Sequence, residues 1–386
     1  MAGASGGVLV TGGSGFLGSL VATTALRRSD GPIVLPIRRP EARDKVLARI
    51  AAEAAAEGEP LRDADRARLH IEPWPPPHGL GAMAARLARL GVRDILHCAG
   101  CLSYFNVAKL LDGNIELTRR MLELGARLDV RRFVFLSTAY CSGFTDALIP
   151  ERLHEKPGED PTDYTRTKRD AEWMVAESGL PWVIVRPSVV IGDSRDGRYG
   201  GKPYGIYQFW GALERYMVGA YPPVLHLVAA RAPVNLLHQE AFVEGFWAAY
   251  RELPDGAVMH LASRDEGLPS MRDLTMLWFR EYGGPRLVHL YERLDAVPMD
   301  TVAPPLRQWL EFTAVNSEIA SVRWNFQRDR LEAMRERGLP FRDVSMETIA
   351  VVQNRFVRDS EKLREFVAQY RECGSPEPEI VVHDAA

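Results

Sequence analysis

A tyrosine and a lysine four residues apart have types and spacing that suit proton transfer. Tyr164 and Lys168 stand at the start of a segment with helical character, where residues i and i+4 share one helix face. An ammonium group beside a phenol lowers the pKa of the phenol and makes it a usable proton donor. Taken alone, the pair is also what an ordinary solvated helix shows. Its meaning depends on the elements around it.

Hydroxyl groups follow an apolar run upstream of this pair. Residues 133–136 predict a buried strand, and Ser137 and Thr138 come directly after it. Ligands bind outside the carboxyl ends of the strands in open α/β sheets. These hydroxyls are therefore expected at the ligand-binding edge.

Three glycines with a spacing of three form a turn near the N-terminus. Residues 11–18 read Thr-Gly-Gly-Ser-Gly-Phe-Leu-Gly, between a predicted strand at Val8–Val10 and a helical pattern. Such a turn lets the backbone approach a pyrophosphate, and the helix N-terminus supplies free N–H groups. A glycine loop without a ligand is the alternative, but the place at the first strand–helix junction favours dinucleotide binding. The residues expected to contact the cofactor here are Thr11, Gly12, Ser14, Gly15, Phe16, Leu17 and Gly18.

The end of the second predicted strand, Ile33–Ile37, carries two arginines in place of an acid. An acid there accepts hydrogen bonds from the adenosine ribose, whereas a guanidinium can clamp a 2′-phosphate. Arg38 and Arg39 therefore predict NADPH rather than NADH. An exposed basic pair at a strand end is the alternative.

The first half of the chain alternates short β-branched runs with helical patterns. This alternation predicts a Rossmann-type, doubly wound parallel α/β sheet with crossover helices on both faces. A smaller, mostly helical C-terminal region is expected to bind substrate. The predicted strands are Val8–Val10, Ile33–Ile37, Leu69–Ile71, Ile95–Cys98, Phe133–Leu136, Trp182–Val185 and Ala257–Leu261. The later predicted helices are Met271–Tyr282, Leu306–Phe312, Arg328–Arg337 and Ser345–Tyr370.

The expected division of the chain into domains follows from this alternation of strands and helices. Residues 1–200 are expected to form the dinucleotide-binding domain, with a further strand near 230–265 returning to it. Residues 201–373 are expected to bind substrate, and residues 374–386 to form a flexible tail. Aromatic residues between Tyr204 and Tyr221 predict either a wall of the substrate pocket or core of the smaller region.

Composition excludes several classes of protein. The 386 residues are 46% hydrophobic and 26% charged, which is typical of a globular chain and not of a disordered or fibrous one. A net charge of −3 gives no reason to expect nucleic acid as a partner. Four cysteines are too few for a disulfide scaffold, and no long apolar segment or signal peptide is recognised, so a cytoplasmic location without a membrane span is expected. The scattered histidines and one Cys-x-x-Cys pair predict no metal site.

Taken together and in this order, the motifs resemble the extended form of the short-chain dehydrogenase/reductase superfamily. The resemblance implies that Thr138 hydrogen-bonds the substrate carbonyl oxygen and that Tyr164 donates the proton. It implies that Lys168 binds the nicotinamide ribose and tunes Tyr164, and that Asn114 supports a proton relay. The turn that lines the nicotinamide side corresponds to Cys98, Ala99 and Gly100.

Three further segments resemble one branch of that superfamily, the fatty acyl-CoA reductases and thioester reductase domains. They are residues 186–197, which include the expected cofactor contacts Pro187 and Ser188, residues 135–140, and Trp324-Asn325-Phe326. The branch implies hydride transfer from NADPH to an acyl thioester carried by coenzyme A or an acyl carrier protein. The product is an aldehyde, and a second hydride gives an alcohol. Thr138 and Tyr164 then stabilise the developing oxyanion.

Other functions fit the same fold. A ketone or aldehyde reductase, or a hydroxy dehydrogenase, keeps the same residues and changes the substrate. A nucleotide-sugar epimerase or dehydratase retains NAD, and Arg38 argues against it because retained NAD favours an acid at that place. A nucleotide-sensing scaffold predicts loss of Thr138, Tyr164 or Lys168, and all three are present.

Overall fold

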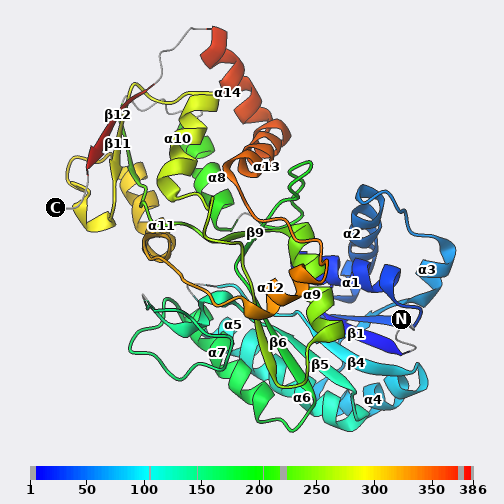
Figure 1. Cartoon of the computed structure of the whole chain (residues 1–386). Coiled ribbons are helices and arrows are strands. Elements are labelled where there is room, and N and C mark those ends of the chain that lie inside the picture. The colour runs from blue at the N-terminus through cyan, green and yellow to red at the C-terminus, as the bar shows by residue number, and fades with distance from the viewer. Residues whose placement is uncertain are drawn as a thin grey trace.

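A seven-stranded parallel sheet lies between helices in the part of the molecule that contains the N-terminus (Figure 1). The computed structural model describes residues 6–103, 106–145, 147–202, 204–217, 224–372 and 378–383. The strand order is β10-β6-β5-β4-β1-β2-β3, with every neighbouring pair parallel. The strands are added outward from β1 to β3 on one side and from β4 to β10 on the other, so the order changes side between β1 and β4. The bounds are β1 Gly7–Thr11, β2 Ile33–Ile37, β3 Leu69–Pro73, β4 Val92–His97, β5 Arg132–Leu136, β6 Trp182–Pro187 and β10 Ala257–Leu261. The predicted Rossmann-type sheet is confirmed.

Helices cover both faces of this sheet, which explains why strands such as β2 and β5 lack polar alternation. Val8 and Val10 face a core shared with α1 and α9, whereas Leu9 between them faces a second core shared with α4 and α6. One face carries α1 (Phe16–Arg28), α2 (Arg43–Ala56), α9 (Gln239–Glu252) and α12 (Asp329–Glu336). The other carries α4 (Leu80–Arg89), α6 (Leu117–Leu128) and α7 (Asp163–Ala176). The short α3 spans Asp63–Arg68.

The C-terminal half of the chain builds a second layer with its own apolar core (Figure 1). Its helices are α8 (Ile206–Met217), α10 (Met271–Tyr282), α11 (Pro304–Ser321), α13 (Met346–Asp359) and α14 (Glu361–Glu372). The segment predicted as one helix over 345–370 is two helices, because Ser360 is extended and its hydroxyl bonds Glu214. Tyr207 and Trp210 of α8 are buried in this core, which places them in the core rather than in a pocket wall; Tyr221 lies outside the described residues.

This region also contains strands that the helical prediction did not include. A three-stranded sheet has the order β12-β11-β8, and β7 pairs with β9. The expected flexible tail is wrong for residues 379–383, which form β12 and pair in parallel with β11 while Ile380 packs on the second core. The bounds are β7 Val189–Ile191, β8 Val224–Val228, β9 Leu236–His238, β11 Leu287–Tyr291 and β12 Glu379–His383.

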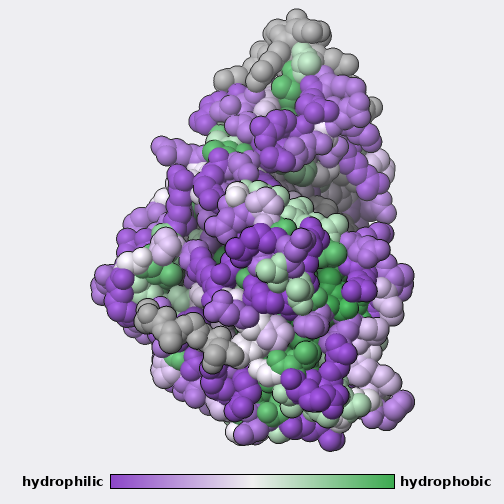
Figure 2. Space-filling model, turned by 90° about the vertical axis from the view of Figure 1, so that its right-hand side faces the viewer, coloured by the Kyte–Doolittle hydropathy of each residue, from purple (hydrophilic) through white to green (hydrophobic). Residues whose placement is uncertain are grey.

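The surface is mostly hydrophilic on the face shown in Figure 2, with small scattered hydrophobic areas. Across the described ranges, no helix combines the length and the apolar character needed to cross a bilayer.

Candidate active site

The glycine turn joins β1 to α1 in a conformation that requires glycine at two positions. Gly12 has a φ of +76°, and a Cβ there would lie 2.8 Å from the backbone nitrogen of Ala99. A Cβ on Gly18 would lie 2.2 Å from the carbonyl oxygen of Gly12. Gly15 precedes α1, and no side chain caps that helix. The first N–H groups of α1 therefore remain available to an anion, as a pyrophosphate site needs.

Gly18→Ala is expected to damage this turn, because its methyl group has no space beside Gly12. We expect dinucleotide affinity to fall at least about tenfold and the free energy of unfolding to fall by about 1–3 kcal/mol. The matched control is Gly211→Ala in α8, where a Cβ meets nothing within 4 Å. The control is expected to gain about 0.5–1 kcal/mol. Dinucleotide titration and equilibrium unfolding measure both effects, and similar results for the two variants would contradict the assignment.

The two arginines after β2 lie at the edge of the sheet next to this turn. Arg38 and Arg39 are exposed, and a single 3-10 turn, Pro40–Ala42, separates them from α2. No hydrogen bond or ion pair joins either guanidinium to another group within the described ranges. Both side chains therefore keep their hydrogen-bond donors for a ligand.

The turn after β4 meets the glycine turn. The backbone nitrogen of Ala99 donates to Thr11 Oγ1 at 3.0 Å, and Thr11 is buried. A Cβ on Gly100 would lie 3.2 Å from Asn114 Oδ1 and 3.9 Å from Lys168 Nζ. The structure thus brings the predicted turn residues next to the predicted catalytic ones. The hydroxyl of Thr11 is used inside the protein, so its direct contact with a cofactor stays a prediction.

Asn114 lies in a π-helical turn, Leu111–Glu116, between α5 (Val107–Leu110) and α6. Such turns occur frequently at functional sites. Its Oδ1 accepts from the backbone nitrogen of Cys101 at 2.7 Å, and its Nδ2 donates to Thr167 Oγ1 at 3.0 Å. The amide therefore fixes the loop after β4 against α7. The part of Asn114 in a proton relay stays a prediction.

Lys168 is buried in the wall of the site. Its ammonium donates to the carbonyl oxygen of Leu136 at 2.6 Å and lies 4.0 Å from the centre of the Phe135 ring. Burial lowers the pKa of Lys168 to about 8. The ammonium is thus fixed at the carboxyl end of β5, one turn of α7 after the half-buried Tyr164.

Local caps place the other two polar groups. A capping box between Thr162 and Thr165 starts α7, and it fixes the position of Tyr164 in the first turn of that helix. Thr138 caps the 3-10 turn Ala139–Ser142 that follows β5, and α7 packs against this turn and against the π-helical turn of Asn114. The four predicted catalytic residues therefore belong to α7 or to the two turns that pack against it.

Sequence reasoning missed the charged pair behind Lys168. One turn further along α7, Glu172 binds Arg186 of β6 in a bidentate pair, with Nε–Oε1 at 2.9 Å and Nη2–Oε2 at 2.6 Å. Both side chains are completely buried, and Cys141 donates its thiol to Glu172. The available signal was an arginine that directly follows the apolar run Val183–Val185.

The end of β6 offers one more group to a ligand. Ser188 is buried, and its backbone nitrogen donates to Leu261. Its hydroxyl has no hydrogen-bond partner among the groups that the structure describes. A buried polar atom without a partner is costly, so this hydroxyl fits a ligand contact. Pro187, which ends β6, precedes it.

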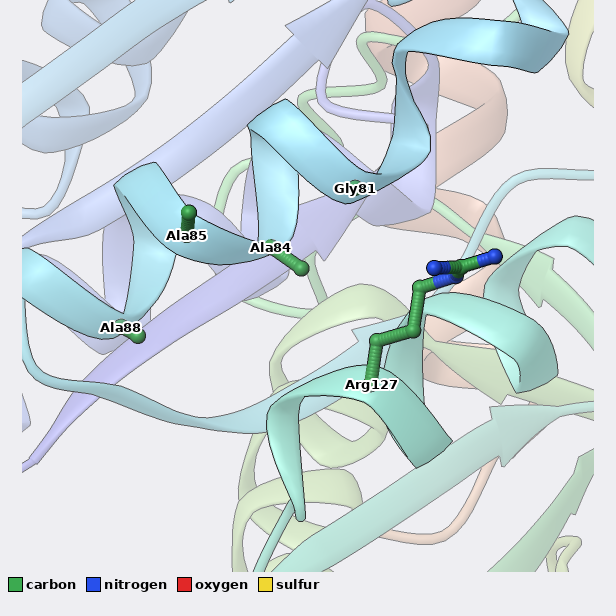
Figure 3. A pocket seen from close by; sticks show the side chains of 5 residues that line it. All are labelled: Gly81, Ala84, Ala85, Ala88 and Arg127. Atoms are coloured by element: carbon green, nitrogen blue, oxygen red, sulfur yellow. The ribbon is translucent and has the colours of Figure 1, made fainter.

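A separate hollow lies between α4 and α6 (Figure 3). It is lined by Gly81, Ala84, Ala85 and Ala88 of α4 and by Arg127 of α6. None of these residues belongs to the predicted site.

The sequence matches a known protein family. Residues 10–239 match the sequence model of the NAD-binding family described as "Male sterility protein". The chain belongs to this family. The match spans every predicted site residue and confirms the resemblance to the extended short-chain dehydrogenase/reductase superfamily.

Individual relatives of this family member are distant. It is 24% identical over 215 residues to the Drosophila melanogaster protein named "Putative fatty acyl-CoA reductase CG8303". That alignment covers 45% of this chain and 38% of the relative, so the chain matches about two fifths of that protein.

Solved structures share the fold. A terminal R domain from the myxalamid PKS-NRPS pathway has a TM-score of 0.72 at 19% identity, over 93% of this chain and 92% of that one. An archaeal thiolation-reductase di-domain has a TM-score of 0.67 at 16% identity, over 92% and 91%. UDP-glucuronic acid 4-epimerase from Bacillus cereus has a TM-score of 0.64 at 14% identity, over 92% and 100%.

Proposed function

We propose that this family member is an NADPH-dependent reductase that transfers a hydride to the carbonyl carbon of an acyl thioester. The observation that carries the proposal is the buried ammonium of Lys168, fixed one helical turn from Tyr164 and beside Gly100 in the turn after β4. The names of the relatives, a fatty acyl-CoA reductase and a thiolation-reductase di-domain, support the thioester as substrate.

The chain has suitable groups for a nicotinamide dinucleotide. Gly12, Gly15 and the free N-terminus of α1 would hold the pyrophosphate, and the unpartnered hydroxyl of Ser188 would meet the nicotinamide end. Arg38 and Arg39 would hold the 2′-phosphate. The cofactor supplies the hydride when it is bound.

The protein residues handle the charge and the proton. Negative charge develops on the carbonyl oxygen, and the hydroxyls of Thr138 and Tyr164 donate to it as an oxyanion hole does. Tyr164 then transfers its proton to that oxygen, and Lys168 keeps the phenol acidic enough to do so. The resulting thiohemiacetal returns its hydroxyl proton to the Tyr164 phenolate as it expels a thiolate, which leaves an aldehyde. A second turnover on the aldehyde gives an alcohol.

The two layers of the molecule would divide these tasks. We propose that residues 1–200, with β10 returned beside β6, bind the cofactor and that residues 201–373 bind the acyl group. The thiol carrier is coenzyme A or an acyl carrier protein in this proposal.

Arg38→Asp is expected to shift the cofactor preference toward NADH. The carboxylate repels the 2′-phosphate and accepts hydrogen bonds from the free ribose diol. We expect the ratio of kcat/KM for NADPH over NADH to fall at least about tenfold. Arg358→Asp, on the distant helix α13, is the control for surface charge. An unchanged ratio in Arg38→Asp would refute the clamp.

Activity is expected to fall as the pH rises above about 8. Burial lowers the pKa of Lys168 to about 8, so its ammonium loses its proton in this range, well below the pH at which an exposed lysine does. A pH–rate profile of kcat/KM measures this basic limb. In Lys168→Arg, whose guanidinium stays charged, the residual activity should lack the limb near pH 8. A profile of the wild type that stays flat to pH 10 would contradict the role of the ammonium.

The experiment that tests the proposal follows NADPH oxidation with a panel of acyl-CoA thioesters and counts free thiol in the same sample. One thiol per NADPH indicates an aldehyde product, and one thiol per two NADPH indicates an alcohol. NADPH consumption with aldehydes or ketones and none with thioesters would replace the proposal with a carbonyl reductase. Purified protein that retains NAD and oxidises no NADPH would favour an epimerase.

A further inference from the structure

A continuous chain of buried hydrogen bonds joins the glycine turn to the helix that carries Tyr164. Thr11 Oγ1 lies 2.7 Å from His97 Nδ1, and His97 Nε2 lies 3.0 Å from Thr118 Oγ1. His97 is fully buried, and each threonine is 1% exposed. The imidazole of β4 therefore bridges the last residue of β1 and the first turn of α6.

The direction of each bond follows from counting protons. Thr118 donates its hydroxyl proton to the carbonyl oxygen of Asn114 at 2.6 Å, so its oxygen must accept from His97 Nε2. His97 is therefore the Nε2–H tautomer, and its Nδ1 accepts the proton of Thr11. Thr11 in turn accepts from the backbone nitrogen of Ala99. Burial lowers the pKa of His97 to about 3, with a contribution from the charge of Lys168, which agrees with a neutral ring.

Both ends of the chain reach the proposed site. Thr11 precedes Gly12 and fixes the turn after β4 through Ala99. At the other end, the side chain of Asn114 donates to Thr167 Oγ1, and that hydroxyl donates to the carbonyl oxygen of Tyr164 at 2.9 Å.

The ring of His97 has a second link to the site through packing. Its centre lies 5.7 Å from that of Phe135, and the ammonium of Lys168 lies over the same phenylalanine ring. A rotated imidazole would therefore disturb the support of Lys168 as well as both hydroxyl contacts.

We propose that His97 is a positioning residue that couples dinucleotide binding at the glycine turn to the placement of Tyr164 and Lys168. The inference rests on the proposed function, because it assigns a consequence to cofactor binding. Each donor and acceptor of the chain is satisfied in one arrangement only, so a shift at one end costs a hydrogen bond at the other. The planar ring sets the distance between Thr11 and Thr118 and makes the link stiff.

The test removes the hydroxyl of Thr118, which is not one of the proposed cofactor contacts, and measures NADPH binding. Thr118→Val keeps the shape of the side chain and removes the hydroxyl, whereas Thr118→Ser keeps the hydroxyl. We expect Thr118→Val to raise the NADPH dissociation constant about 3–10-fold and to lower kcat by a similar factor. Thr118→Ser should remain within about twofold of the wild type in both. Fluorescence titration measures the dissociation constant without any substrate.

A double-mutant cycle tests the coupling itself. We expect Thr11→Val/Thr118→Val to weaken NADPH binding little more than the worse single variant, because either change already frees the imidazole. The control is Thr275→Val in α10, whose buried hydroxyl donates only to Met271 of its own helix. It should change stability without changing NADPH binding.

Two results would overturn the inference. One is Thr118→Val with reduced thermal stability but unchanged NADPH binding and kcat, which would make the chain purely structural. The other is a double variant whose loss is the product of the two single losses. Wild-type protein that binds NADPH but reduces no thioester would refute the proposed substrate and leave the cycle valid. Wild-type protein that binds neither NADPH nor NADH would refute both proposals.

Discussion

Tyr164→Phe is expected to lower kcat at least about 100-fold, the scale of losing a positioned proton donor. The phenylalanine ring keeps the packing at the start of α7 and removes only the hydroxyl. NADPH affinity should therefore stay within about twofold, because the pyrophosphate turn and the arginines after β2 are unchanged. Steady-state kinetics with an acyl-CoA thioester and an NADPH titration measure the two effects separately.

A second hydroxyl deletion controls for general damage. The hydroxyl of Tyr250 in α9 donates to Asp94 of β4 at 2.6 Å, and neither residue belongs to the predicted site. Tyr250→Phe should lower the free energy of unfolding by about 1–3 kcal/mol and leave kcat unchanged. Wild-type turnover in Tyr164→Phe, or equal losses in the two variants, would remove Tyr164 from its proposed role.

Glu172→Gln is expected to lower the free energy of unfolding by about 3–5 kcal/mol. The change leaves the Arg186 guanidinium charged and completely buried, without the carboxylate that now holds two of its nitrogens. This is a large fraction of the stability of a typical domain. Chemical denaturation measures it.

Two comparison variants test whether the unpaired buried charge causes the loss of stability. Asp359→Asn breaks an exposed pair with Arg355 on α13 and should cost less than about 1 kcal/mol. Glu172→Gln/Arg186→Met removes both charges and should cost less than the sum of its two single changes, because no buried charge then lacks a partner. A loss for Glu172→Gln as small as that for Asp359→Asn would show that the pair contributes little.

The large sheet could be predicted because most of its strands are buried on both faces. Runs such as Ile33–Ile37 and Phe133–Leu136 are apolar throughout and need no knowledge of their neighbours. The three-stranded sheet could not be predicted in this way. Its strands β8 and β11 place His226 and His289 between apolar residues, β12 begins with Glu379 and ends with His383, and β12 pairs with β11 from far along the chain. Short strands of mixed polarity carry too little local signal.

The predicted site shows the same division. Gly12, Gly18, Tyr164 and Lys168 were recognised because each belongs to a spacing within one turn or helix. Glu172 with Arg186, and His97 with Thr118, are partners on different elements. In the sequence, nothing distinguishes an acid or histidine that has a buried partner from any other, because only the folded sheet brings the two partners together. Physical reasoning from one sequence therefore finds local motifs and misses the groups that hold them in place.

The most direct test of thioester reduction by this protein follows the hydride itself. NADPH deuterated at C4, prepared separately on each face of the ring, is mixed with the wild-type protein and an acyl-CoA thioester, and the product is analysed by mass spectrometry. We expect label from one face to appear at C1 of the aldehyde, with one deuterium per thiol released. Thiol released without deuterium in the product would mean hydrolysis, and no released thiol would mean that the thioester is not the substrate.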